Sequence, residues 1–419
     1  MNLLRGSYTI LFFKLSGAAL MLIANLIISN LYGASQLGVF NLMLTSLQLS
    51  ALFSRVGIDI FFLKVLPNLK DSADITGFLL KAFGRVIITG LTVTVIFYFS
   101  SGFIDTYIFR DYDVQDSLIW LSFLIIPFTV FTIIPEILRS FNNIVLFSFI
   151  RNVLLQLGII SSILFIVLTG FNNIIFGLFL GAFIAFIISL VILSSFLWKL
   201  ELNLRNYNKY KKGLVRYSVH MFLTSSILLI MGHVDKYMIG YFLNEENVGY
   251  YTVCLKISII VTFVLSSVTS YITPKISKNY QSKNYKALRT NYKKSTKLII
   301  LSSLPLIIII SVFPDFFLSL FGSEFMKLKS ILYLVLLMNI ANIFFGPLIY
   351  VLNMMDEEIY VRNILFLALL LNLLLNYFLL PIYGIEGAAV ATLISTVFWK
   401  ALLFTKLRQK LKALDGAEL

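Results

Sequence analysis

The sequence is poor in charge and in cysteine. Only 13% of its 419 residues are charged and the mean hydropathy is +0.92, whereas a soluble domain carries about 25% charged residues. This composition excludes a water-soluble globule. The single cysteine, Cys254, excludes an intrachain disulfide and leaves the redox compartment open.

Motifs of common enzyme chemistry are also missing. The chain has no GxxxxGK[ST] phosphate loop, no HExxH pair, no paired-cysteine metal site and no nucleophile elbow. We therefore expect no nucleotide-driven motor, no metal and no other cofactor. A membrane glycosyltransferase or polymerase is the enzyme alternative. Such an enzyme needs a sizeable outer loop or acidic residues, and the longest predicted outer connection, residues 101–116, is short.

Long apolar runs occupy most of the chain. A bilayer-spanning helix needs about 20 mostly apolar residues, whereas barrel strands alternate in polarity over about ten. The runs are continuous, so we predict an all-α integral membrane protein. Its twelve transmembrane helices are expected at 8–30, 37–58, 82–104, 117–137, 146–168, 173–197, 214–242, 248–272, 297–321, 330–352, 359–380 and 386–404.

The basic residues predict the orientation in the membrane. The net charge is +14, and 28 of the 34 Lys and Arg residues fall in one alternating set of connections against three in the other. Basic residues are retained on the cytoplasmic side, so both termini are expected in the cytoplasm. Topology thus accounts for the charge, and nucleic acid is not an expected partner.

The sequence also contains a weak internal repeat. At an offset of 211 residues, 31–42 falls on 242–253 and 150–152 falls on 361–363. Six helices per half predict two lobes in pseudo-two-fold symmetry about an axis along the membrane normal, with a cavity between them. We expect an N-terminal lobe at 1–198, a basic linker at 199–213, a C-terminal lobe at 214–404 and a cytoplasmic tail at 405–419.

Three stretches resemble a known transporter family. Residues 234–251 (VDKYMIGYFLNEENVGYY), 383–396 (YGIEGAAVATLIST) and the region of Gly38 and 55–59 (RVGID) are similar to bacterial polysaccharide repeat-unit flippases of the multidrug/oligosaccharidyl-lipid/polysaccharide (MOP) exporter superfamily. The resemblance implies a transporter rather than an enzyme, in the bacterial inner membrane. The implied cargo is an undecaprenyl-diphosphate-linked oligosaccharide, above all an O-antigen unit, moved from the cytoplasmic to the periplasmic leaflet.

The resemblance also implies partners and leaves alternatives open. Membrane lipids, a polysaccharide polymerase and a chain-length regulator are the implied partners. Capsule or another exopolysaccharide is an alternative cargo. A cation-coupled multidrug exporter of the same superfamily is the alternative transporter, although many of those use a carboxylate in the first helix and residues 8–31 contain none.

An anionic diphosphate needs a cationic path, because a charge at the bilayer centre costs at least about 2.5–3.5 kcal/mol. We expect Lys14, Arg55 and Lys256 to face the cavity, with Lys236 as a weaker candidate. Lys14 and Arg55 also lie near enough to a helix end to extend their charged groups to the headgroups instead. Arg151 and Arg362 border cytoplasmic connections and are candidates for cargo entry, although topology alone explains them.

Two titratable residues of the seventh span are further candidates. Asp235 is expected to form an ion pair with Lys256 or to carry a coupling proton, and His233 is a weaker coupling candidate. The tyrosines of this region are interpreted as a belt at the membrane interface. The basic stretch 277–297 is expected to be a surface helix or a loop against anionic headgroups.

Overall fold

A computed structural model describes residues 3–69, 71–109, 114–170, 173–198, 223 and 226–416. Every regular element in these residues is a helix, so the predicted all-α class is confirmed. The chain divides into two compact units, Met1–Leu229 and Ile230–Leu419. The predicted linker at 199–213 lies outside the described residues.

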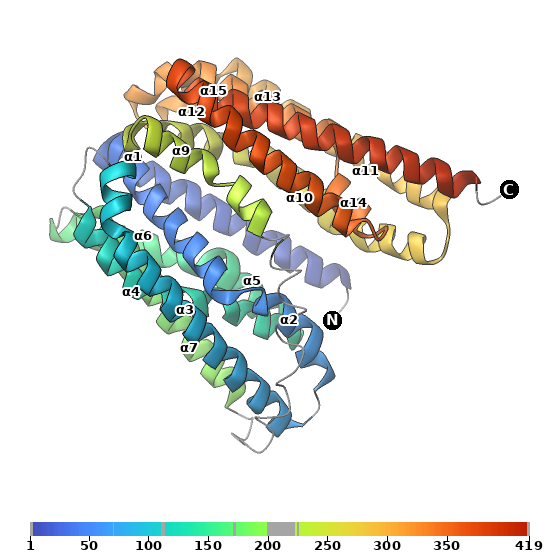
Figure 1. Cartoon of the computed structure of the whole chain (residues 1–419), viewed down its shortest axis with the longest axis horizontal. Coiled ribbons are helices and arrows are strands. Elements are labelled where there is room, and N and C mark those ends of the chain that lie inside the picture. The colour runs from blue at the N-terminus through green and yellow to red at the C-terminus, as the bar shows by residue number, and fades with distance from the viewer. Residues whose placement is uncertain are drawn as a thin grey trace. The chain divides into compact units, whose positions relative to one another are not determined.

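The first unit begins with a helix that folds back on itself (Figure 1). Helix α1 (Leu3–Arg55) reverses at Gly33, whose φ of 79° belongs to the left-handed region that glycine tolerates. The Asn41 side-chain amide donates to the Asn25 side-chain oxygen at 3.2 Å, which holds the two arms side by side. An outer loop is expected at 32–37, between the predicted spans 8–30 and 37–58, and this expectation is wrong, because only the turn at Gly33 separates the two arms.

The rest of the first unit packs around this hairpin. After α1 come α2 (Ile58–Val65), η1 (Leu66–Asn68), α3 (Ser72–Ile108), α4 (Gln115–Ser140), α5 (Ile144–Phe149), η2 (Ile150–Leu154), α6 (Leu155–Thr169) and α7 (Ile174–Leu197). Asp71, Asn143 and Asn173 cap α3, α5 and α7 by accepting backbone N–H donors of the first turn. Glycine allows the backbones of α6 and α7 to pack closely, since a Cβ on Gly158 of α6 would lie 2.4 Å from the Gly181 carbonyl oxygen of α7.

The second unit ends in another folded-back helix. Its elements are α9 (Val234–Phe242), α10 (Glu245–Gln281), α11 (Tyr285–Val312), α12 (Pro314–Ser319), η4 (Ser323–Leu328), α13 (Lys329–Phe345), α14 (Leu348–Asn353) and α15 (Glu358–Gly416). Helix α15 turns at Gly384, with φ 59°, and the Asn372 amide donates across the two arms to the Thr392 hydroxyl at 3.2 Å.

The helices account for the predicted spans. Within the described ranges, nine helices are long and apolar enough to cross a membrane. Two of them, α1 and α15, fold back and supply two spans each, and α9 is the described end of another. Large apolar side chains such as Phe99 and Leu168 are exposed on the helix surfaces, as expected for a chain surrounded by lipid. The protein is a twelve-helix, multi-pass membrane protein.

The basic stretch at 277–297 differs from its prediction. It is not a separate surface helix or a long loop, because α10 and α11 continue through it and turn at Ser282–Asn284. Helix α10 has 37 residues, which is about 55 Å at 1.5 Å per residue, whereas the hydrocarbon core is about 30 Å thick. The hairpin therefore extends α10 and α11 beyond the hydrocarbon core.

Candidate functional site

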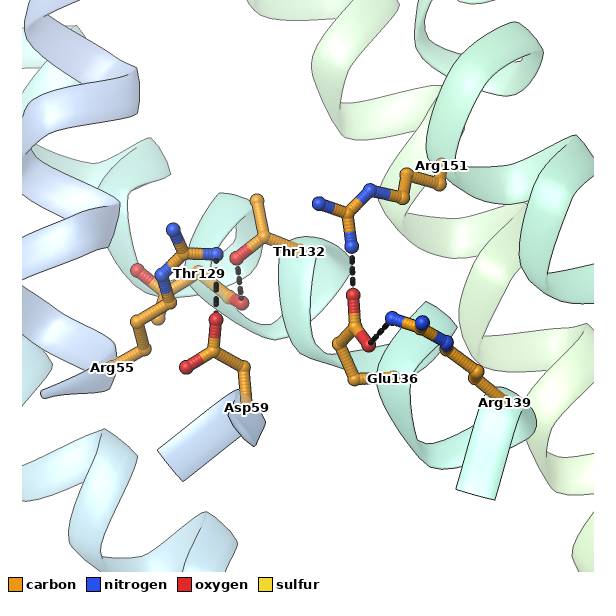
Figure 2. A network of polar contacts seen from close by, with 7 residues as sticks. All are labelled: Arg55, Asp59, Thr129, Thr132, Glu136, Arg139 and Arg151. Carbon is orange, nitrogen blue, oxygen red and sulfur yellow. Dashed lines mark hydrogen bonds and ion pairs between the residues drawn. The ribbon is translucent and has the colours of Figure 1, made fainter. Parts of the chain in front are cut away.

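A glutamate inside α4 organises the charged groups of the first unit. Glu136 is 5% exposed in a helix that is otherwise mostly apolar. Its carboxylate pairs with the guanidinium groups of Arg151 and Arg139, the latter at 3.5 Å. Figure 2 shows both arginines turned toward this one carboxylate. A buried carboxylate requires such compensation because burial removes its hydration.

A second ion pair, between Arg55 and Asp59, lies near Glu136 and its arginines (Figure 2). Helix α1 ends at Arg55, and the next two residues, Val56 and Gly57, adopt left-handed φ values of 44° and 73°. This turn starts α2 and returns the Asp59 carboxylate to the Arg55 guanidinium at 3.3 Å. The Thr89 hydroxyl of α3 donates to the carbonyl of Ser54, which fixes the end of α1 from the other side.

Close packing between α1 and η2 positions Arg151. The η2 segment is a π-helical turn, a distortion that is common at functional sites, and Arg151 lies within it. Gly17 of α1 packs directly on this turn, since a Cβ on Gly17 would lie 2.0 Å from the Asn152 carbonyl oxygen. Lys14, one helical turn earlier, is thereby brought within electrostatic range of Arg151.

These groups form what we call the arginine cluster, which consists of Lys14, Arg55, Asp59, Glu136, Arg139 and Arg151. Arg151 is also within electrostatic range of Arg55 and Asp59, so the two ion pairs belong to one network. Four cations and two carboxylates leave a formal surplus of two positive charges. The side chains of Arg151 and Arg139 are 52% and 46% exposed, so an incoming anion can reach them. The cluster is suited to bind an anion such as a phosphate or diphosphate.

The second unit holds a different polar arrangement around Asp235. The buried Asp235 carboxylate accepts hydrogen bonds from the Tyr251 hydroxyl at 3.1 Å, the Asn376 amide at 2.9 Å and the Thr392 hydroxyl at 2.5 Å. These donors come from α10 and from both arms of α15. The carboxylate thus joins α9, α10 and the α15 hairpin through uncharged partners, whereas its ion pair with Lys256 stays a prediction.

Three other predicted residues of this unit lie close to one another, and one of them, Lys236, is within electrostatic range of Asp235. His233 immediately precedes α9 and lies within electrostatic range of Lys236 and Lys256. Both lysines are 7% exposed, which is unusual for a residue type that is almost never fully buried without a compensating partner. The structure therefore brings together the predicted residues of the second unit except Arg362, which is half-buried near the start of α15.

The interpretation of the tyrosines is partly wrong. Tyr271 is exposed, as expected for an interfacial belt, but Tyr250 and Tyr251 are buried. Tyr251 donates to Asp235, and Tyr250 donates to Glu246 while accepting a hydrogen bond from Lys327 at 2.8 Å. Both buried tyrosines therefore satisfy charged groups instead of anchoring the chain at an interface.

Sequence reasoning missed the residues that hold these clusters together. Glu136 lies at the end of the predicted span 117–137 and is the only acidic residue in that run, but it is not among the predicted site residues. Thr129, Thr132, Glu136 and Arg139 recur at helical spacing on α4, and Figure 2 shows them together on the side that faces the network. That spacing was the available signal. For Asn376 and Thr392, no local pattern indicates a contact with Asp235.

Comparison with known proteins places the chain in a family. The family described as "Polysaccharide biosynthesis protein" matches residues 27–329, which is well over half of the chain. The chain belongs to this polysaccharide biosynthesis family. No curated protein matches it. The predicted resemblance to polysaccharide transporters is therefore confirmed at the level of the family.

Solved structures show which fold this family member adopts. The chain is similar to the lipid II flippase MurJ in an inward closed conformation, with a TM-score of 0.75 and 15% identity over 97% of this chain and 87% of that one. It is similar to an outward-facing MATE multidrug transporter of the MOP superfamily, with a TM-score of 0.71 and 15% identity over 98% and 96%. A MOP transporter from Pyrococcus furiosus gives a TM-score of 0.70 and 14% identity over 98% and 96%. The protein thus has the fold of MOP-superfamily transporters.

Proposed function

We propose that this protein is a flippase for undecaprenyl-diphosphate-linked oligosaccharides, and that O-antigen units are its cargo. It moves them by alternating access from the cytoplasmic to the periplasmic leaflet of a bacterial inner membrane, with both termini in the cytoplasm. The protein acts as a transporter and performs no chemistry on the glycan. Its membership of a polysaccharide biosynthesis family and its MOP fold support this proposal.

The arginine cluster carries the proposal. Its surplus of two positive charges matches a diphosphate, which cannot enter hydrocarbon without compensation. Guanidinium groups bind phosphate oxygens in a bidentate manner, and Arg151 and Arg139 have exposed surface for such a contact. Glu136 keeps both guanidinium groups in place and stays paired with them when the cargo binds, so the diphosphate meets the surplus positive charge and the buried carboxylate keeps its partners.

The other predicted cations are assigned to the same path. Lys236 and Lys256 contact the diphosphate later in transport, and Arg362 meets it at entry. The cluster disfavours an exporter of cationic drugs, because a net positive site repels a cationic substrate. Asp235 and His233 are the candidates for coupling transport to an ion gradient.

The decisive experiment measures transport in a strain whose own copy of the gene is deleted. Arg151→Gln should stop surface-polysaccharide display and cause the undecaprenyl-linked glycan to accumulate on the cytoplasmic leaflet, at wild-type protein level. Lys329→Gln is the matched control, because Lys329 is a half-exposed cation paired with Asp315 in the second unit. Equal display by both variants would remove the arginine cluster from the mechanism.

A further inference from the structure

A polar pocket of about 530 Å³ lies in the second unit, between the α10–α11 turn and the α14–α15 turn. It shares no residue with the arginine cluster or with the polar groups around Asp235. Pockets of roughly 300–1,000 Å³ hold small ligands. The side chains that matter here are Tyr280, Gln281, Lys283 and Tyr285 from the first turn, and Asn353 and Asp356 from the second.

We call this cavity the hairpin pocket, and hydrogen bonds fix the two turns that line it. In the first turn, the Lys283 N–H donates to the Tyr280 carbonyl at 3.0 Å, and Asn284 caps α11 by accepting from the Ala287 N–H at 3.0 Å. In the second turn, the Lys410 ammonium donates to the Met355 carbonyl at 2.7 Å. A preformed pocket loses less conformational entropy when it binds a ligand.

An ion-pair clamp beside the pocket anchors the second turn to the end of α15. Glu357 pairs with Lys410 at 2.7 Å and with Lys406 at 3.2 Å. Partial burial alone would raise the pKa of Glu357, but the hydrogen bonds from Lys410 and Lys406 outweigh burial and hold that pKa below its usual value. The clamp is therefore ionised at neutral pH, and Glu357 neutralises the Lys410 ammonium, which lies 5.9 Å from the centroid of the Tyr280 ring.

The charges of the lining argue against a phosphate ligand. Lys283 and Asp356 are its two charged residues, and their charges cancel. The remaining polar groups are amides and hydroxyls, and the Asn353 side-chain oxygen is buried with no hydrogen-bond partner among the described residues. That oxygen has no surface open to the pocket, so a ligand meets the rest of the Asn353 side chain and the other amide and hydroxyl groups of the lining, which donate and accept hydrogen bonds.

Two aromatic rings complete the chemistry of the pocket. The ring centroids of Tyr280 and Tyr285 lie 6.3 Å apart at an interplanar angle of 55°, so the two rings form neighbouring walls. An aromatic ring offers an apolar face next to a polar hydroxyl. Rings beside amide groups match a sugar, which has C–H faces and a rim of hydroxyls.

We propose that the hairpin pocket binds a neutral sugar residue of the cargo's glycan. This inference rests on the proposed function, because it takes the glycan as the cargo, and it adds a second contact point besides the diphosphate. The arginine cluster binds the anionic part of the cargo, whereas the hairpin pocket recognises its uncharged part.

Titration of the purified full-length protein in lipid nanodiscs tests this site. The probe is the oligosaccharide released by mild acid from the surface polysaccharide of the strain that carries the gene, followed by saturation-transfer NMR. Wild type should bind it saturably, and Asn353→Ala and Tyr280→Ala should each weaken binding about tenfold. Tyr280→Phe should bind nearly as wild type because the ring remains. Tyr271→Ala is the matched control, since Tyr271 is an exposed tyrosine of the same helix outside the pocket.

Three outcomes would overturn the proposal. The first is the absence of saturable binding by wild type, and the second is equal binding by Asn353→Ala, Tyr280→Ala and Tyr271→Ala. The third is binding that disappears when salt rises from about 0.05 to about 0.5 M, because screening of that strength indicates an anionic ligand. The proposed function fails separately, when Arg151→Gln leaves display unchanged.

Discussion

The contact between Gly17 and the π-helical turn makes a sharp prediction. In Gly17→Ala the new Cβ would lie 2.0 Å from the Asn152 carbonyl oxygen, whereas ordinary contact begins at 3.4 Å, so α1 and η2 must separate by about 1.4 Å. Both sides of this contact are backbone, and neither can move aside as a side chain would. Overpacking of this kind costs about 1–3 kcal/mol, and the movement draws Arg151 away from Lys14.

Gly84→Ala is the control for this prediction. Gly84 lies inside α3, and nothing lies within 4 Å of its Cβ position. Both substitutions gain about 0.8–1 kcal/mol of helix propensity, so the difference between the two variants isolates the steric term. Thermal unfolding in detergent should place Gly17→Ala about 1–3 kcal/mol below Gly84→Ala, with reduced surface-polysaccharide display. Equal stability and equal display would refute the account of how η2 is positioned.

The remaining predictions concern charged groups of both units. Glu136→Gln should cost about 1.5–3 kcal/mol because it removes the negative charge shared by two guanidinium groups and turns one acceptor oxygen into a donor, whereas Arg139→Gln, at a half-exposed position, should cost under about 1 kcal/mol; equal losses in chemical denaturation would contradict this difference. Lys256→Ala should stop display while Lys256→Arg remains milder, because the charge persists; normal display by Lys256→Ala at wild-type protein level would remove Lys256 from the mechanism. Because the pKa of Glu357 is lowered in the folded protein, its ion-pair clamp stabilises the fold fully at pH values above the unfolded-state pKa of about 4.3. This stabilisation is lost as the pH falls through the lower folded-state pKa. The difference in melting temperature between wild type and Glu357→Gln should therefore be constant from pH 7 to about pH 5 and shrink at lower pH, and a difference that grows on acidification would be inconsistent with the clamp.

The fold was largely predictable because each span is a local signal. A run of about 20 apolar residues is sufficient evidence for a membrane helix, and most predicted runs coincide with helices. The ends were less predictable. Nothing in the composition shows that Gly33 and Gly384 each make a turn of one residue, since the backbone conformation of a glycine depends on how the flanking helices pack.

The candidate site was predictable only in part, for a related reason. Lys14, Arg55 and Arg151 stand out as cations in or beside apolar runs, and the structure brings them together. Glu136 was missed because a carboxylate near the end of an apolar run is normally interpreted as the polar end of a membrane helix. Its pairing with Arg151 crosses 15 positions of sequence and depends on the turn at Asn142, whose φ is 59°. Contacts of that kind follow from tertiary packing and leave no local pattern.

The turn at Gly33 has a consequence for how the chain enters the membrane during synthesis. Two spans joined without a loop have almost no polar segment to translocate between them, so they are suited to insert together as a helical hairpin. The same pair carries Lys14 in one arm and Arg55 at the end of the other, and each cation alone lowers the tendency of its span to leave the translocon. Insertion as a pair lets Asn25 and Asn41 satisfy each other as the two arms enter the lipid. A long hydrophilic insertion at Gly33 would uncouple the arms, and the first arm should then be retained less efficiently in glycosylation-mapping assays of membrane insertion.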